Sequence, residues 1–133
     1  MSSTNRVVIT GLGTVNACGL SVPESWQAIK AGVSGIGPLT RFDTEEFTSK
    51  IAGELKDFDP TVAVERHEVK RFDPFIQYAL VAAREAVEDS GVDFGSVDLD
   101  RAGAIIGSGI GGLQTIEEQY TILGKRGPRR ISP

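Results

Sequence analysis

The sequence is poor in the residues that build disulfides, metal sites and membrane spans. Cys18 is the only cysteine among 133 residues and His67 is the only histidine, which excludes an intrachain disulfide and a cysteine cluster with zinc spacing. No apolar run approaches the roughly 20 residues that a membrane helix needs, and the start has no signal-peptide core. We therefore expect a cytoplasmic protein with no membrane span and no metal.

Charge is present but unevenly distributed. The chain is 40% hydrophobic and 24% charged, as in an ordinary globular domain, and its net charge of −4 argues against general nucleic-acid binding. All 18 acidic residues precede residue 124, so the end of the chain carries only basic side chains. These basic residues, which suit an acidic partner, are Lys125, Arg126, Arg129 and Arg130.

The first half of the chain predicts a strand, a loop and a helix. Residues 6–13 form a β-branched apolar run that ends at glycine, which is typical of a strand buried on both faces. Ser21 and Glu24 form a capping box for a helix with one apolar face, and Gly32 is its natural stop. Less regular segments predict a short strand within 49–55 and a charged surface helix over 61–72.

The second half gives the clearest helix. Asp73 is placed to cap a helix over 74–90, which is apolar on most sides. A strand is expected over about 102–107, then a helix from Leu113 that ends at Gly124. This order predicts an α/β protein with parallel strands. Two strands are too few for a complete sheet, so we expect a fragment.

A glycine-rich loop follows the second predicted strand. Residues 107–112 read GSGIGG, which fits the G-x-G-x-x-G pattern of dinucleotide-binding loops. That fingerprint also needs an acidic residue about 20 positions on, and the nearest acids, Glu117 and Glu118, fall inside the predicted helix. The other interpretation is that the glycines allow a close approach of backbone or substrate.

The reactive and basic side chains have ordinary explanations on sequence alone. Cys18 has no activating base near it in the sequence, and His67 lies in a charged, solvated stretch without ligand spacing. Arg66 and Lys70 stand four residues apart, on one face of the predicted helix. With Arg71 they form a second basic set, whose simplest explanation is also a solvated surface.

Six segments together resemble one family, in order and in approximate spacing. They are VVITGLG, AGVSGI, RFDTEEF, DPFIQYALVAAREAVEDSG, GAIIGSGIGG and GPRRISP. The chain, from about Arg6 to Pro133, closely resembles the N-terminal portion of the β-ketoacyl-acyl-carrier-protein synthases II, the condensing enzymes of type II fatty-acid synthesis. The resemblance implies a thiolase-like layered α/β fold, of which residues 1–133 are an incomplete domain. It also implies a homodimer, no cofactor and elongation of acyl chains by decarboxylating condensation with malonyl-carrier.

The resemblance also assigns roles to residues. Ile110 matches the residue that gates the acyl pocket, and Gly109 and Gly111 beside it let the backbone change its angles. The family's catalytic cysteine and two histidines follow Pro133 in the family pattern, so no catalytic residue is carried over and these 133 residues alone are expected to be inactive. The positions expected to dock acidic acyl carrier protein are Arg66, Lys70, Arg71, Lys125, Arg126, Arg129 and Arg130.

Two other functions stay open at this point. One is a nucleotide-binding α/β module that uses Gly107–Gly112. The other is a non-catalytic relative of the chain-length factors, which keeps the fold without the nucleophile. Binding of NADH would favour the first, whereas the presence of the cysteine and histidines would exclude the second.

Overall fold

The computed structural model describes residues 6–132. The expected domain covers residues 1–133, of which residues 1–5 and Pro133 lie outside the described residues. The elements, in order, are α1 (Val22–Lys30), β1 (Ile36–Pro38), β2 (Ile51–Gly53), the 3-10 turn η1 (Pro60–Val62), α2 (Pro74–Ser90), the 3-10 turn η2 (Leu99–Arg101), α3 (Leu113–Arg126) and the 3-10 turn η3 (Pro128–Arg130).

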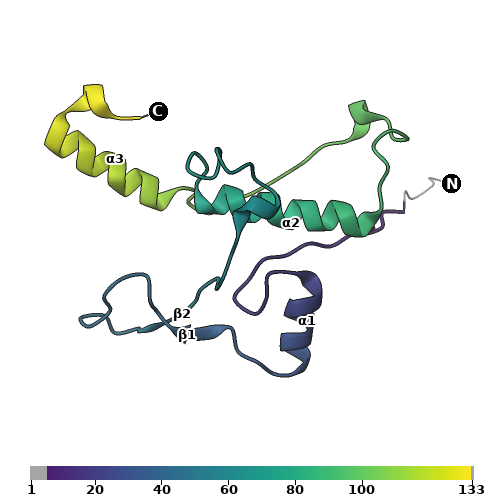
Figure 1. Cartoon of the computed structure of the whole chain (residues 1–133), viewed down its shortest axis with the longest axis horizontal. Helices are drawn as coiled ribbons and strands as arrows, with labels where there is room; N and C mark the ends of the chain where they lie inside the picture. Colours follow the sequence, from purple (N-terminus) through teal and green to yellow (C-terminus); the bar gives the residue numbers. More distant parts are fainter. Residues whose placement is uncertain (1–5, 133) are drawn as a thin grey trace.

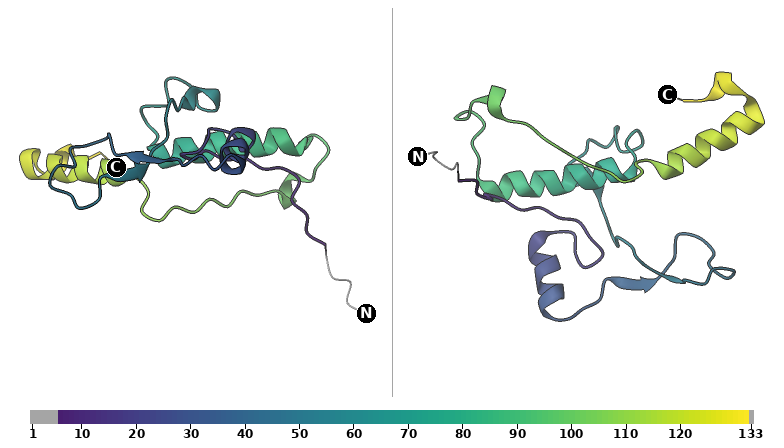
Figure 2. Two further views of the ribbon diagram at one scale, coloured as in Figure 1. Left: turned by 90° about the horizontal axis from the view of Figure 1, so that it is seen from below. Right: turned by 180° about the vertical axis from the view of Figure 1, so that it is seen from behind.

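Helix α2 is the element around which the others are arranged (Figure 1). Helix α1 and the β1–β2 pair lie on one side of it, and α3 begins beside its N-terminal end and runs away from it. In Figure 2 the three helices and the β pair lie roughly in one plane, with the turns around η1 on one side of this plane and the extended segment 102–107 on the other. The buried apolar side chains are Val64, after η1, and Val81 on α2.

Helix α2 confirms the boundaries expected from its sequence. Its N-cap position is Asp73, and Gly91 ends it with φ of 61°, in the left-handed region that glycine adopts most easily. The side chain of Asp73, however, makes no hydrogen bond to the first turn of α2. Its carboxylate has a different partner, described below.

Helix α1 is also confirmed, but its apolar face does not point inward. The Ser21 hydroxyl accepts the Glu24 N–H at 3.3 Å, which is the first half of the expected capping box. The Glu24 carboxylate accepts the Leu20 N–H at 2.8 Å, one residue before the cap. The buried residue of α1 is Ser25, which is 5% exposed, whereas Trp26 is 56% exposed. The expected core-facing stripe is therefore open in this structure.

The segment preceding α1 packs directly against α2. A Cβ on Gly13 would lie 2.6 Å from the backbone nitrogen of Ala86, and one on Gly11 equally close to that of Ser90. The Leu12 N–H donates to the Asp89 carboxylate at 2.9 Å, in the same contact. Glycine is required here because the two backbones leave no room for a side chain.

The predicted strands 6–13 and 102–107 are wrong for this structure. Neither forms a ladder, and the only paired strands among residues 6–132 are β1 and β2, which run antiparallel with Gly37 opposite Ala52. Val7 is 93% exposed and Ile105 is fully exposed. The apolar pattern favours extended backbone locally, but a strand also needs a neighbour, and none of the described residues supplies one. The short strand within 49–55 is confirmed as β2.

Two helix predictions need correction. Residues 61–72 do not form a helix: η1 is followed by successive turns, held by bonds such as Val69 N–H to the Glu65 carbonyl at 3.2 Å. Helix α3 does not end at Gly124 but continues to Arg126 and stops at Gly127, whose φ is 76°. Gly124 has open space around it, so a helix passes through it at the modest cost that any interior glycine carries.

Candidate functional site

The glycine-rich loop at residues 107–112, named the gate loop after its expected role, is a tight turn that leads into α3. The Gly111 N–H donates to the Ser108 hydroxyl at 3.0 Å, which closes the turn around Ile110. Gly111 has φ of 78°, and a Cβ built on it would lie 3.7 Å from the Phe75 ring. Ile110 is 68% exposed, at the tip. The loop thus presents one exposed apolar side chain on a glycine frame.

Asp73 joins this loop to the start of α2. Its carboxylate accepts a hydrogen bond from the Thr115 hydroxyl in the first turn of α3. It also fills the space that a side chain on Gly112 would need. Gly112 is therefore glycine because of close approach, which is the second of the two explanations left open by the sequence.

The same contact argues against a dinucleotide site. In such a site the pyrophosphate occupies the N-terminus of the helix that follows the glycine loop. Here the carboxylate of Asp73 already occupies the first turn of α3, where Thr115 donates to it. A negative charge at that place repels phosphate, and the strand that should precede the loop is unpaired.

The first basic set lies in the turns that precede α2. Arg66, Lys70 and Arg71 are all exposed. Because residues 61–72 are turns rather than one helix, the expectation that Arg66 and Lys70 share a helical face is wrong. The turns are fixed to α2 by Gln77, whose side-chain amide donates to the Phe72 carbonyl at 2.7 Å and to the Val69 carbonyl at 2.9 Å.

The second basic set lies around the C-terminal end of α3. Its four members are exposed: Lys125, Arg126, Arg129 and Arg130. The Ser132 N–H donates to the Gln119 side chain at 2.8 Å, so the chain after η3 folds back along α3. The 14 residues of α3 span about 21 Å. Because α3 runs away from the N-terminal end of α2, the second basic set lies well apart from the first (Figure 1).

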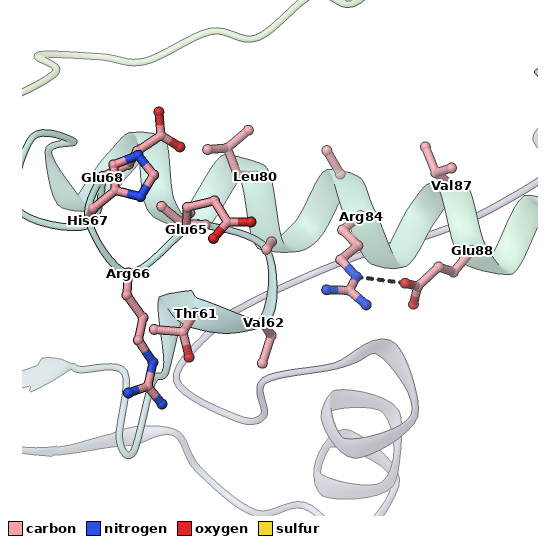
Figure 3. Close-up of a pocket in the computed structure, with 13 residues that line it drawn as sticks. Thr61, Val62, Glu65, Arg66, His67, Glu68, Leu80, Arg84, Val87 and Glu88 are labelled. Atoms are coloured by element: carbon pink, nitrogen blue, oxygen red, sulfur yellow. Dashed lines mark hydrogen bonds and ion pairs between the residues drawn. The ribbon is translucent and has the colours of Figure 1, made fainter.

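A groove of about 1060 Å³ lies between the turns after η1 and α2 (Figure 3). Its apolar lining includes Val62, Leu80 and Val87. Its charges are mixed, and Arg84 is paired with Glu88 at 2.6 Å. The acidic lining residues Glu65, Glu68 and Glu88 outnumber the arginines Arg66 and Arg84. The groove itself therefore does not suit an acidic partner.

Arg66 and His67 differ in their surroundings. The pKa of Asp59 lies below its ordinary value because Thr61 donates its hydroxyl at 2.7 Å and its backbone N–H at 2.8 Å, and Arg66 adds an attraction. The Arg66 side chain points away from α2 in Figure 3, and His67 lines the groove. Both residues line the groove, and the Arg66 side chain extends outward from it.

Cys18 does not resemble a nucleophile in its surroundings. It is half-buried, and its backbone N–H donates to the Asn16 side chain at 2.8 Å. Its pocket neighbours include Lys56 and Asp57 but not His67. Within residues 6–132, no three side chains of the histidine, cysteine, aspartate and glutamate types gather as a metal site would need. No helix in the described part of the chain combines the length and apolar character needed to cross a bilayer.

Sequence reasoning missed the residues that hold the gate loop. Asp73 was expected to cap α2, and neither Thr115 nor Phe75 was assigned a role. The Asp73–Thr115 bond joins residues 42 positions apart, so no local pattern signals it. The only signal in the sequence was Asp73 itself, which precedes Pro74 at the start of α2. Nothing in the local pattern shows that its carboxylate bonds the start of α3 instead.

Comparison with known proteins places these features in one family. The family model described as beta-ketoacyl synthase, N-terminal domain, matches residues 4–133. The chain is 48% identical over 96% of its length to 3-oxoacyl-[acyl-carrier-protein] synthase 2 of Coxiella burnetii, and 47% identical over its whole length to the protein of that name from Staphylococcus aureus. It spans 31% and 32% of these two relatives.

Solved ketosynthase structures share the fold. The ishigamide ketosynthase/chain length factor matches 95% of the chain with a TM-score of 0.73 and 32% identity. A type II PKS ketosynthase in complex with its acyl-carrier protein matches 98% with a TM-score of 0.78 and 26% identity. The chain covers 32% and 33% of these structures. It therefore has the thiolase-like α/β fold of the ketosynthases over the shared part, and it belongs to the beta-ketoacyl synthase family, whose N-terminal domain it matches.

Proposed function

We propose that the protein carrying this sequence is a 3-oxoacyl-[acyl-carrier-protein] synthase that elongates fatty acyl chains. The observation that carries the proposal is 43–48% identity to synthases of that name over 96–100% of the chain. The match covers the gate loop and both basic sets, since it spans residues 4–133 in the family model. The chain covers about a third of these relatives, so the activity belongs to the whole protein rather than to these residues alone.

The proposed reaction has two half-reactions. An enzyme thiol first takes the acyl group from the carrier thioester, and the carrier thiol leaves with the proton. Malonyl-carrier then loses carbon dioxide, and its carbanion attacks the acyl thioester. The products are a 3-oxoacyl-carrier longer by a two-carbon unit, carbon dioxide and, after uptake of one proton, the free enzyme thiol. By the family pattern the thiol and its two histidines lie outside residues 1–133.

In this proposal the gate loop controls access of the acyl chain to the pocket. Ile110 closes the entrance, and Gly109 and Gly111 supply the backbone freedom for it to move. The support is the exposed position of Ile110 on a turn whose glycine has positive φ. No cofactor takes part in the proposed chemistry.

The two basic sets are proposed to dock an acidic acyl carrier protein. Their exposure supports this role, as does the similarity to a ketosynthase solved in complex with its acyl-carrier protein. Electrostatic attraction of this kind raises the rate of association and fixes orientation. The docking surface comprises Arg66, Lys70, Arg71, Lys125, Arg126, Arg129 and Arg130.

We further propose a homodimer that works in the cytoplasm, with residues 1–133 as part of one synthase domain. Many large apolar side chains are exposed in the described structure, among them Val7, Ile9 and Ile106. Monomeric soluble proteins rarely leave large apolar patches exposed. These side chains therefore need a cover, which the rest of the domain or a second subunit would supply. Light scattering of the purified protein tests the assembly, since a monomer would contradict it.

A second candidate function is a partner without its own nucleophile. It is favoured by the similarity to a solved ketosynthase/chain length factor at 32% identity. Such a protein would keep the fold and bind carrier but would not take an acyl group. It differs from the first candidate in one measurable step, the acylation of the protein.

Acylation therefore tests the proposal. The whole protein encoded by the gene is incubated with acyl-carrier thioester, and its intact mass is measured. We expect the addition of one acyl group, and the same addition in a Cys18→Ser variant. No addition would favour the second candidate, and loss of the addition in Cys18→Ser would overturn the placing of the nucleophile. Saturable binding of NADH would instead support a nucleotide-binding module.

A further inference from the structure

We propose that the Asp73–Thr115 hydrogen bond is a clamp that transmits carrier docking at Lys70 and Arg71 to the gate loop. The inference rests on the proposed function, because it names how docking and gating in such a synthase are connected through this chain. Asp73 and Thr115 are positioning residues, since neither is proposed to touch substrate.

The docking side of the clamp is a short, stiff connection. Only Phe72 separates Arg71 from Asp73 in the sequence. The Phe72 carbonyl accepts from the Gln77 amide at 2.7 Å, and its N–H donates to the Glu68 carbonyl at 3.2 Å. A displacement of the backbone at Lys70 or Arg71 therefore also displaces Asp73, because no flexible segment separates them.

The gate side is equally direct. The Asp73 carboxylate bonds the Thr115 hydroxyl and fills the space beside Gly112, the residue that ends the gate loop. The preceding residue, Gly111, lies against the Phe75 ring, which belongs to the first turn of α2. The exit of the gate loop is thus held in part by the residues at the beginning of α2.

Asp73 has two possible partners, which makes the clamp a two-state element. Aspartate at an N-cap position normally accepts an N–H from the first turn of its own helix. In this structure Asp73 makes no such bond and holds α3 instead. When the carboxylate turns back to cap α2, Thr115 and Gly112 are released. Carrier docking beside Asp73 biases this choice, and a physical element with two arrangements is what coupling between sites requires.

The test removes the clamp with little change of shape. Thr115→Val deletes the hydroxyl, Thr115→Ser keeps it, and Thr121→Val is the matched control at an exposed position of the same helix. Hydrogen–deuterium exchange of residues 107–113 is measured in the whole protein, first without carrier. We expect Thr115→Val to speed exchange about tenfold or more, as the loss of a hydrogen bond to a charged group predicts. Wild type, Thr115→Ser and Thr121→Val should agree with one another, and equal exchange in Thr115→Val would overturn the clamp.

The coupling is tested by adding acyl carrier protein. In wild type and Thr115→Ser the carrier should speed exchange of the gate loop, whereas in Thr115→Val it should add nothing. The variant should also change kcat for acyl transfer while leaving the carrier Kd unchanged. A carrier effect that persists in Thr115→Val would overturn the coupling. If wild type neither binds carrier nor accepts acyl groups, the proposed function and the coupling are both contradicted. The exchange rates measured without carrier would still show whether the Asp73–Thr115 bond holds the gate loop.

Discussion

The carboxylate of Glu85 on α2 accepts the backbone N–H of Val22, the first residue of α1, at 2.7 Å. Its other oxygen accepts the Thr14 N–H at 2.8 Å. One half-buried carboxylate thus satisfies two backbone donors that belong to the loop and helix start packed on α2. Negative charge is also favourable at the N-terminus of a helix. Glu85 thus ties the loop at Thr14 and the first residue of α1 to α2.

Removing this carboxylate should destabilise the protein. Glu85→Ala leaves two backbone donors without a partner, so we expect the free energy of unfolding to fall by about 1–3 kcal/mol. The matched control is Glu88→Ala, because Glu88 forms only an exposed ion pair with Arg84, worth about 0.5 kcal/mol. Urea unfolding of the whole protein measures both. Equal losses in the two variants would contradict the role given to Glu85.

Two glycines should respond to alanine with opposite signs. A Cβ at position 13 collides with the backbone of α2, so Gly13→Ala should cost about 1–3 kcal/mol, as overpacking does. Gly124 lies inside α3 with open space around it, so Gly124→Ala should gain about 0.5–1 kcal/mol of helix stability. Thermal unfolding compares them, and a stabilising Gly13→Ala would show that the loop does not pack on α2 as described.

Reversing charge in the second basic set should weaken binding of acyl carrier protein. We expect Arg129→Glu combined with Arg130→Glu to lower the affinity about tenfold or more and to reduce its dependence on salt, because rim charges act mainly through steering. The control is Lys30→Glu with Arg101→Glu, which changes the net charge equally at exposed positions outside both sets. Titrations at low and high salt measure the effect. Unchanged affinity in the first pair would remove these residues from the docking surface.

The contact between Thr40 and Glu54 should make part of the stability depend on pH. The pKa of Glu54 lies below its ordinary value of 4.5 because the Thr40 hydroxyl donates to it at 2.8 Å, with a further bond from the Thr40 N–H. A depressed folded-state pKa stabilises the fold above the unfolded-state value, and this contribution is lost as pH falls through the folded-state value.

Thr40→Val should therefore unfold more easily than wild type near neutral pH, and the difference should shrink as pH falls below 4.5. Urea unfolding at a series of pH values below about pH 7 follows this difference between the two proteins. Thr44→Val, on the same loop and outside this contact, is the control. A difference that grows in acid would show that the hydroxyl does not stabilise the ionised carboxylate.

The helices could be predicted from sequence because their signals are local. Ser21 with Glu24, and Asp73 with Gly91, mark the ends of α1 and α2 within a few residues of each helix. The end of α3 was misplaced because an interior glycine costs a helix little, whereas Gly127 with positive φ followed by Pro128 stops it. The strands at 6–13 and 102–107 could not be settled in this way, because a ladder depends on a neighbour that the local pattern does not specify.

The candidate site also has one part that could be predicted from sequence and one part that could not. The glycine run, with Ile110 at its centre, was visible in the sequence, and the resemblance gave it a role as a gate. What holds the run in place was not visible, because Asp73 reaches across 42 positions to Thr115. An aspartate before proline predicts a cap on its own helix, and only the three-dimensional arrangement shows that a second helix start competes for it.

The most direct test of the account is chain elongation by the whole protein. The whole protein encoded by the gene is incubated with an acyl-carrier thioester and malonyl-carrier protein. The carrier-bound products are then identified by mass spectrometry. We predict a 3-oxoacyl-carrier longer by a two-carbon unit, with release of one carbon dioxide for each product. Consumption of neither substrate, or loss of carbon dioxide from malonyl-carrier without growth of the acyl chain, would contradict the assignment as a synthase.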